Sequence, residues 1–473
     1  MNKNNRLKTK IGYTAAFFSC VLASISHLYI DFENVGLMSL MPVIAVLTCA
    51  MITKRSVESL LLGCLIGYLM LDPVHFVQKM IDTNLDVLSD GVTTWIIGLT
   101  FLVGGLIALI NHSGGTQAFG TTISKYAKSR ASTLIVTWIM GLIIFVDDYL
   151  NALAVGTTMK KLSDKFKVSR QMLAYIVDST SAPMCVLVPI STWAIFLIGL
   201  FEANNVFEKG AGFQGYLELI PYIFYAWIAI LMVPIVSMGW IKPLGAMRAA
   251  EEKAAKGIIE ETESFEIRKV DSPSIVNFII PLAVFMLATW YFDYNTLNGV
   301  VVAILFTIPL LLIQKISSMS TIVDTIISGF NSMMHPMLVV ISSFVLQRLN
   351  DELGLSSFIL EAAVPYMNAS FLPLITFVVL SLLAFATGSF WGVYAIALPV
   401  VFPLAQALDA NIPLTMGALV SAGVFGSHAC FFGDSTVITA KGAGCTPYSH
   451  ALTQLPYASI AAVLSCILFF ILG

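Results

Sequence analysis

Four carboxylates of this 473-residue chain lie deep inside long apolar stretches, where an ionised side chain is costly. They are Asp147, Asp148, Asp178 and Asp434. On insertion scales, a carboxylate at the centre of a membrane helix costs roughly 2.5–3.5 kcal/mol. No Lys or Arg stands within a few residues of any of them, so a bound cation or a proton is the simplest compensation.

The adjacent pair Asp147 and Asp148 suits a site that handles both a cation and a proton. Asn151 follows at i+4 and i+3, so its amide is expected on the same helix face as both acids. Adjacent carboxylates repel each other, which favours a proton on one of them. One acid would then carry a proton beside a second acid that binds the cation.

The third acid begins a run of small polar residues, Asp178-Ser179-Thr180-Ser181, which is followed by Ala182 and Pro183. Proline lacks a backbone N–H and interrupts a helix, so carbonyl oxygens are expected to be left without partners here. Carboxylate, hydroxyl and carbonyl oxygens are hard ligands that suit a hard cation such as Na⁺.

A second set of polar residues follows in the C-terminal half. The candidate positions there are Thr387, Ser389, Ser427, His428, Asp434, Ser435 and Thr436. We take Asp148, Asp178 and Asp434 as the candidate Na⁺ ligands. His428 lies six residues before Asp434 and is a candidate proton site, whereas His27, His75, His112 and His450 are interpreted as peripheral.

The composition excludes most soluble functions. Only 11% of the residues are charged, against about 25% in soluble globular proteins, and the mean hydropathy is +0.87. The 25 basic and 28 acidic residues leave no basic excess for nucleic acid. We predict an all-α polytopic membrane protein that is not an enzyme and needs no cofactor.

Three apolar segments exceed 30 residues, namely 131–161, 171–201 and 371–405, whereas one span needs about 20 residues. Lys and Arg favour the cytoplasmic side of short loops. If 131–161 and 371–405 enter and leave on the same side, 22 of the 25 basic residues fall on one face. The prediction is about 11 transmembrane helices plus two re-entrant hairpins, with the N-terminus cytoplasmic.

The chain also shows a weak internal repeat at an offset near 240 residues. Residues 1–240 carry hairpin 131–161 and an interrupted helix at 171–201, and residues 275–473 carry hairpin 371–405 and an interrupted helix at 412–440. The polar segment 241–274 would join the halves as an exposed cytoplasmic helix and a flexible stretch. The charge rule gives the halves opposite orientations, an inverted-topology repeat that is common in secondary transporters.

Two motifs resemble the NhaC family of Na⁺/H⁺ antiporters. They are FVDDYLNALAVGTTMKKLSDKFKVSRQMLAYIVDSTSAPMCVLVPISTW at residues 145–193 and SAGVFGSHACFFGDSTVITAKGAGC at residues 421–445. The resemblance extends over nearly the whole chain. It implies a scaffold domain, a transport domain with two hairpins, a homodimer and elevator-like motion. It also carries ion-site roles onto Asp147, Asp148, Asp178, Ser179 and Asp434.

The leading hypothesis is a transporter of the bacterial inner membrane that exchanges Na⁺ for H⁺ by alternating access. Because the family resembled here also includes malate–lactate exchangers and amino-acid carriers, fold alone does not fix the substrate. The second hypothesis is therefore a Na⁺-coupled carrier of an amino acid or small organic anion. An intramembrane aspartyl protease and a cation channel are further alternatives, but clustered acids and broken helices in two similar halves favour a carrier.

Overall fold

A computed structural model describes residues 36–53, 56–258, 273–293, 295–355, 358, 367–387, 390–431 and 433–473. Within these ranges the chain is helical and contains no strand, which confirms the all-α prediction. The short 3₁₀ helices are η1 (Gly36–Leu40), η2 (Ile220–Tyr222) and η4 (Ala369–Phe371).

The α-helices of the first part of the chain begin with α2 (Met41–Thr53), α3 (Ser56–Leu71), α4 (Phe76–Ser89), α5 (Gly91–His112), α6 (Gly115–Ser124), α7 (Arg130–Ile143) and α8 (Asp148–Lys165). They continue with α9 (Arg170–Ser179), α10 (Ala182–Leu187), α11 (Thr192–Ala203), α12 (Gly212–Leu219), α13 (Phe224–Ser237) and α14 (Gly245–Ala255).

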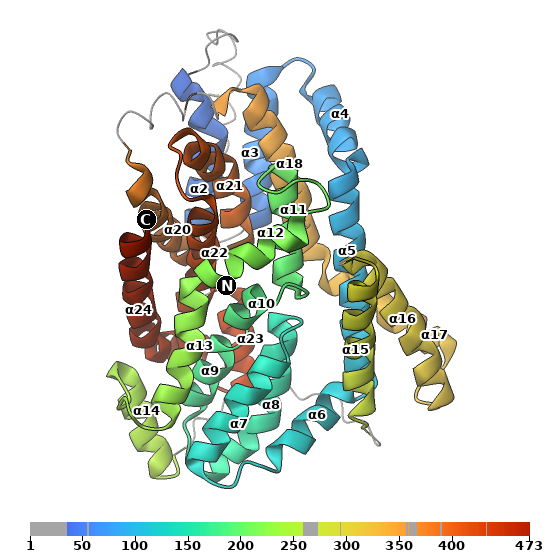
Figure 1. Ribbon diagram of the computed structural model, residues 1–473, viewed down its shortest axis with the longest axis vertical. Coiled ribbons are helices and arrows are strands. Elements are labelled where there is room, and N and C mark those ends of the chain that lie inside the picture. Colours follow the sequence, from blue (N-terminus) through green and yellow to red (C-terminus); the bar gives the residue numbers. More distant parts are fainter. Residues whose placement is uncertain are drawn as a thin grey trace, which may run out of the picture.

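The second part contains α15 (Val276–Tyr291), α16 (Thr296–Ile313), α17 (Met319–Ser332), α18 (Met334–Glu352), α20 (Leu372–Thr387), α21 (Phe390–Ala407), α22 (Ile412–Ala429), α23 (Asp434–Ala443) and α24 (Pro447–Leu472). Helices α15, α16 and α17 stand at one side of the molecule next to α5 (Figure 1).

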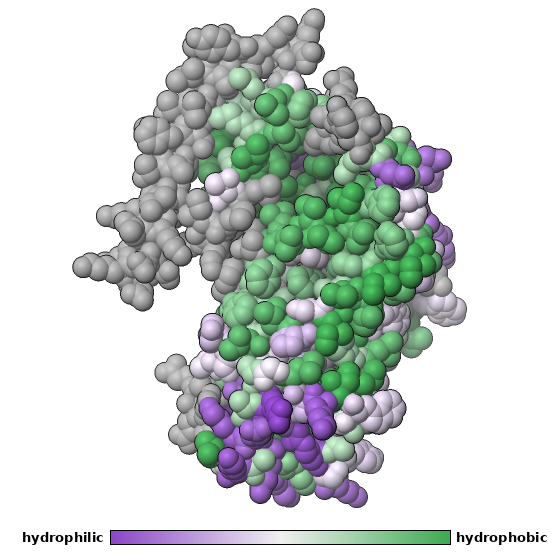
Figure 2. Space-filling model, turned by 90° about the vertical axis from the view of Figure 1, so that its left-hand side faces the viewer, coloured by the Kyte–Doolittle hydropathy of each residue, from purple (hydrophilic) through white to green (hydrophobic). Residues whose placement is uncertain are grey.

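Apolar helices long enough to cross a membrane recur along the described residues. Six runs qualify by length and composition, or up to eight if two bent pairs each count as one span. Figure 2 shows a broad apolar band above a hydrophilic lower end. The chain is a multi-pass membrane protein, whereas the number of crossings and the re-entrant character of the two hairpins stay predictions.

Two of the three basic residues that the charge rule places on the opposite face, Lys79 and Lys209, lie beside acids. Lys79 Nζ is 2.6 Å from the Glu352 carboxylate, and Lys209 Nζ is 3.9 Å from that of Asp90. Helix α4, which carries Lys79, stands at the upper end of the molecule in Figure 1, whereas α14 lies at the lower end. The charges of the upper end are therefore partly paired with one another.

Each half contains a pair of packed helices followed by an interrupted helix. In the first half α7 packs against α8, and residues 170–203 are divided into α9, α10 and α11. In the second half α20 packs against α21, and a break separates α22 from α23. Opposite orientation of the two halves stays a prediction.

The expectation of an exposed helix in the segment 241–274 needs correction. Helix α14 does form there, but one of its faces is packed against α9 and α24, with Met247 and Ala254 buried. The Glu251 carboxylate on that face is only 8% exposed. The linker helix is therefore attached to the core, and residues 259–272 lie outside the described ranges.

Helices α8 and α23 approach closely because both carry glycine at their contact. A Cβ added at Gly156 would lie 2.8 Å from the carbonyl carbon of Gly442, and one added at Gly442 would lie 2.5 Å from the Ala152 carbonyl oxygen. Small residues at such contacts allow membrane helices to pack closely. This contact positions α23, which supplies two hydroxyls to the site described below.

Gly156→Val is expected to push α23 away from α8. Forcing extra methyl groups into a packed contact costs about 1–3 kcal/mol, so the melting temperature in detergent should fall. Gly91→Val is the matched control, because a Cβ there meets no atom within 4 Å. Equal melting temperatures for the two variants would contradict this account of the packing.

Candidate functional site

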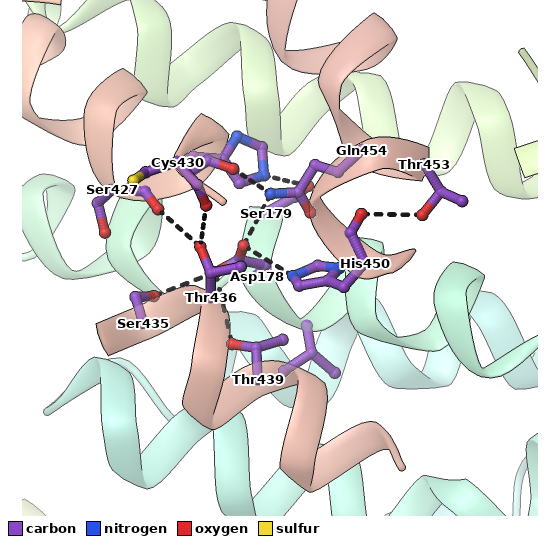
Figure 3. A network of polar contacts seen from close by, with 12 residues as sticks. Asp178, Ser179, Ser427, Cys430, Ser435, Thr436, Thr439, His450, Thr453 and Gln454 are labelled. Atoms are coloured by element: carbon purple, nitrogen blue, oxygen red, sulfur yellow. Dashed lines mark hydrogen bonds and ion pairs between the residues drawn. The ribbon is translucent and has the colours of Figure 1, made fainter. Parts of the chain in front are cut away.

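The carboxylate of Asp178 lies at the centre of a buried polar network that joins the two halves of the chain (Figure 3). It stands at the C-terminal end of α9 and is 1% exposed. Its Oδ1 accepts from Ser435 Oγ at 3.1 Å and Thr439 Oγ1 at 3.4 Å, both on α23. Its Oδ2 lies 3.1 Å from His450 Nε2 and accepts from Gln454 Nε2 at 2.7 Å. The two oxygens thus have different partners, hydroxyls on one and N–H groups on the other.

His428 connects this network to two further helices. Its Nε2 lies 3.0 Å from the hydroxyl of Ser179, and its Nδ1 lies 2.7 Å from that of Tyr225 on α13. Its backbone carbonyl accepts a second hydrogen bond from the Gln454 amide. The imidazole is buried, and each of its nitrogens has a hydroxyl partner.

The break between α22 and α23 is closed by its own polar residues. Thr436 Oγ1 donates to the Cys430 carbonyl at 2.7 Å and lies 3.4 Å from that of Ser427. The hydroxyls of Ser427 and of Ser181 are buried without a hydrogen-bond partner among the described residues. These two oxygens retain lone pairs available to a ligand.

Asp147 and Asp148 form a second acidic position at the start of α8. Asp147 is the N-cap of that helix, and its side chain accepts from the Leu150 N–H at 2.9 Å and from Thr192 Oγ1 at 3.2 Å. Asp148 is the first residue of α8 and is 2% exposed. A carboxylate at a helix N-terminus is stabilised by unpaired N–H groups and by the helix dipole. These interactions offset part of the free-energy cost of burying the two carboxylates, a cost that the sequence analysis expected a bound cation or proton to offset.

Asn151 joins the α7–α8 pair to the helix break beside Asp178. Its amide nitrogen lies 2.7, 2.9 and 2.9 Å from the carbonyl oxygens of Gly141, Ile144 and Thr180, which share its two N–H groups. The Thr180 carbonyl, which sequence reasoning left open for a cation, therefore already has a donor. Pro183 lies in the first turn of α10, where a missing N–H costs little. In this conformation Asn151 therefore links α7 and α8 to the break after α9. Its Oδ1 has no hydrogen-bond partner among the described residues.

Asn151→Ala is expected to destabilise the protein by about 2–4 kcal/mol, because three buried carbonyls lose a shared donor. Thermal unfolding in detergent measures this loss. Asn84→Ala is the control, since Asn84 donates to Tyr68 Oη and to the Met80 carbonyl at a more exposed position and should cost less than about 1 kcal/mol. A similar loss of stability in both variants would show that the contact of Asn151 with three carbonyls contributes no more than an ordinary hydrogen bond.

The structure corrects the interpretation of His450 as peripheral. His450 is fully buried and contacts Asp178 directly. Gln454, Thr439 and Tyr225 were also missed. His450 and Gln454 stand four residues apart on α24, a spacing that places both on one helix face, and this polar pair at the start of an apolar segment was the available signal.

Three of the predicted site residues are not tested by this geometry. Ser389 lies outside the described ranges, and of Thr387 and Asp434 only the backbone positions, in α20 and α23, are described. Within the described part of the chain, no three His, Cys, Asp or Glu side chains are grouped to hold a metal ion. A Na⁺ site at Asp178 would rely on hydroxyl, amide or carbonyl oxygens beside one carboxylate.

A multi-pass helical fold with broken helices around a buried carboxylate is typical of a secondary transporter. The sequence profile of the Na⁺/H⁺ antiporter family matches residues 184–473, more than half of the chain. The chain belongs to this family, which confirms the resemblance to NhaC proteins drawn from the two motifs. The protein is a transporter and not an enzyme.

Two relatives share sequence with the chain. A Haemophilus influenzae protein described only as uncharacterised is 27% identical and aligns over 94% of this chain and 92% of its own. The malate-2H⁺/Na⁺-lactate antiporter of Bacillus subtilis is 24% identical over 44% of this chain and 45% of its own.

Two solved structures share the fold at low identity. The MtrF protein of Neisseria gonorrhoeae, described as illuminating a class of antimetabolite efflux pumps, has a TM-score of 0.57 at 10% identity and covers 84% of each chain. The YdaH transporter of Alcanivorax borkumensis has a TM-score of 0.51 at 12% identity and covers 84% of this chain and 88% of its own. At such identities these similarities concern the fold alone.

Proposed function

We propose that this protein exchanges Na⁺ for H⁺ across the membrane by alternating access, with the Asp178 carboxylate as the group for which the two ions compete. The observation that carries the proposal is the division of this buried carboxylate between two hydroxyls on Oδ1 and two N–H groups on Oδ2. The ionised form needs compensation, and either a proton or a cation supplies it. One negative charge binds only one of them well at a time.

The surroundings of Oδ1 suit a cation. A serine or threonine hydroxyl has two lone pairs besides its proton, so Ser435 and Thr439 can rotate from donors into cation ligands. Hydroxyl and carboxylate oxygens are the hard ligands that Na⁺ prefers. The N–H groups of His450 and Gln454 would hold Oδ2 in place during that change. Membership of the Na⁺/H⁺ antiporter family supports the same exchange.

The test is a flux measurement with the purified full chain in liposomes that contain a pH-sensitive dye. Na⁺ added outside is expected to drive protons out of the lumen, and K⁺ at the same concentration is not. The assay is run between about pH 6 and pH 9, the range around the usual pKa of His. Failure to see a Na⁺-dependent signal at any pH in this range would refute Na⁺/H⁺ exchange.

A second candidate is Na⁺-coupled transport of a small organic anion or an amino acid. It is favoured by the sequence similarity to the malate-2H⁺/Na⁺-lactate antiporter of Bacillus subtilis. Labelled lactate, malate and amino acids are offered to the same liposomes with and without a Na⁺ gradient. Uptake of one of them that requires Na⁺, together with Na⁺-driven proton flux only in its presence, would favour this candidate.

We propose the bacterial inner membrane as the location, with the N-terminus cytoplasmic and a homodimer as the assembly. The concentration of basic residues at one face supports the orientation. By this orientation the end that carries α14 and the α8–α9 connection faces the cytoplasm.

A further inference from the structure

A cavity of about 160 Å³ lies between α14, the α8–α9 connection and the first turns of α24. Its polar lining consists of Asp164, Ser169, Arg170, Gln171, Lys253, Ser449 and Thr453. It lies at the end of the molecule that α14 occupies in Figure 1. The Arg170 guanidinium is paired with Asp164 at 3.3 Å, which offsets the positive charge that it brings to the lining.

Two helices lead from this cavity to Asp178. Gln171 lines the cavity, and Asp178 stands seven residues later on α9, which is about two turns and about 10 Å along the same helix face. On α24, Ser449 and Thr453 line the cavity, whereas the residues that follow each of them, His450 and Gln454, contact Asp178. The cavity and the buried carboxylate therefore lie along the same two helices, about two turns of α9 apart.

The cavity end of α9 is held in place by three consecutive residues. Ser169 binds the Glu251 carboxylate of α14 through its hydroxyl at 2.6 Å and its N–H at 3.0 Å. Arg170 donates to the Gly444 carbonyl at the end of α23 at 3.1 Å, and Gln171 Nε2 donates to Ser449 Oγ of α24 at 2.8 Å. Each contact reaches a different element, so the first turn of α9 closes this end of the site.

We propose that this cavity is the inner vestibule of the ion pathway and that the Gln171–Ser449 hydrogen bond is the gate between it and Asp178. Gln171 is nearly buried, whereas Ser449, which lines the cavity, is partly exposed. This difference is expected of a pair that separates an open cavity from a buried site. The bond joins two neutral side chains, which separate at lower cost than a buried ion pair does. The Glu251 contacts hold α14 in place as the outer wall. This inference rests on the proposed function, since it names the route by which a hydrated Na⁺ reaches Asp178.

The test measures access to the site with a small cationic thiol reagent that does not cross membranes. The full chain is expressed with its seven cysteines replaced, because Cys445 itself lines the cavity, and Thr439→Cys is introduced as the reporter beside Asp178. Gln171→Ala and Ser449→Ala are each expected to speed modification from the α14 side about five- to tenfold, the change that corresponds to one neutral hydrogen bond. Using both variants protects the test against misfolding of one.

Arg248→Ala is the control. It breaks the exposed pair between Arg248 and Glu252, both on α14 and outside the gate, so it should leave the modification rate unchanged. A second reporter, Ala249→Cys on the α14 wall of the cavity, should react rapidly from the α14 side with the gate intact. Unchanged rates in both gate variants, or modification only from the opposite side, would overturn the proposal. Because access is measured without ion flux, its failure is distinguishable from failure of Na⁺/H⁺ exchange, which the dye assay reports.

Discussion

Asp178→Asn is expected to reduce Na⁺-dependent transport by on the order of a hundredfold or more while membrane expression stays near normal. Two charges 4 Å apart interact by about 4 kcal/mol at an effective dielectric constant of 20, so loss of the carboxylate charge removes most cation binding. The fold should tolerate the change. The amide oxygen can accept from His450 and Gln454, and the amide nitrogen can donate to the hydroxyls of Ser435 and Thr439.

The matched control is Asp82→Asn, which removes an exposed carboxylate that accepts from Gln78 on α4. Its transport should stay within about twofold of the unmodified chain, since exposed polar contacts contribute little. Asp148→Asn is expected to abolish transport as well, because this buried acid is the second candidate ion ligand. Wild-type transport in both Asp178→Asn and Asp148→Asn would show that these acids are structural.

Gln454→Leu is expected to have the largest effect on stability. The amide nitrogen of Gln454 donates both to Asp178 and to the His428 carbonyl, and leucine has a similar volume but no donor. A hydrogen bond to a charged group contributes about 1.5–3 kcal/mol, and a buried carbonyl left unpaired costs about 1–3 kcal/mol. The free energy of unfolding should therefore fall by about 2–5 kcal/mol, measured as a lower melting temperature in detergent.

Gln78→Leu is the control for this substitution, because Gln78 is exposed and donates only to the Asp82 side chain, four residues away on the same helix. It should change the melting temperature little. If the two variants melt at the same temperature, the Gln454 amide does not stabilise Asp178. The description of Asp178 Oδ2 as an oxygen held by N–H donors would then be wrong.

The sequence identified the buried acids because an ionised side chain in an apolar stretch is costly wherever it lies. It also predicted a helix interruption just after Asp178, since the nearby Pro183 lacks a backbone N–H. Asp147 was found because of this cost of burial, and its capping role at α8 was not foreseen. Such inferences depend on neighbours in sequence.

The partners of Asp178 could not be predicted in the same way. His450 and Ser435 stand 272 and 257 residues away from it in sequence, and only the packing of α9 against α23 and α24 brings them together. His450 was misjudged because it lies at the beginning of an apolar segment, where a polar residue is also typical of a loop. The three-carbonyl contact of Asn151 likewise depends on how α7, α8 and α9 pack.

Proton release on Na⁺ binding tests the central claim most directly. Because cation binding to a carboxylate site displaces protons, adding NaCl to the purified chain in weakly buffered detergent should release about one proton per chain. KCl at the same ionic strength should release none, and Asp178→Asn should release none with either salt. No release from the unmodified chain, or equal release from Asp178→Asn, would contradict competition of Na⁺ and H⁺ for Asp178.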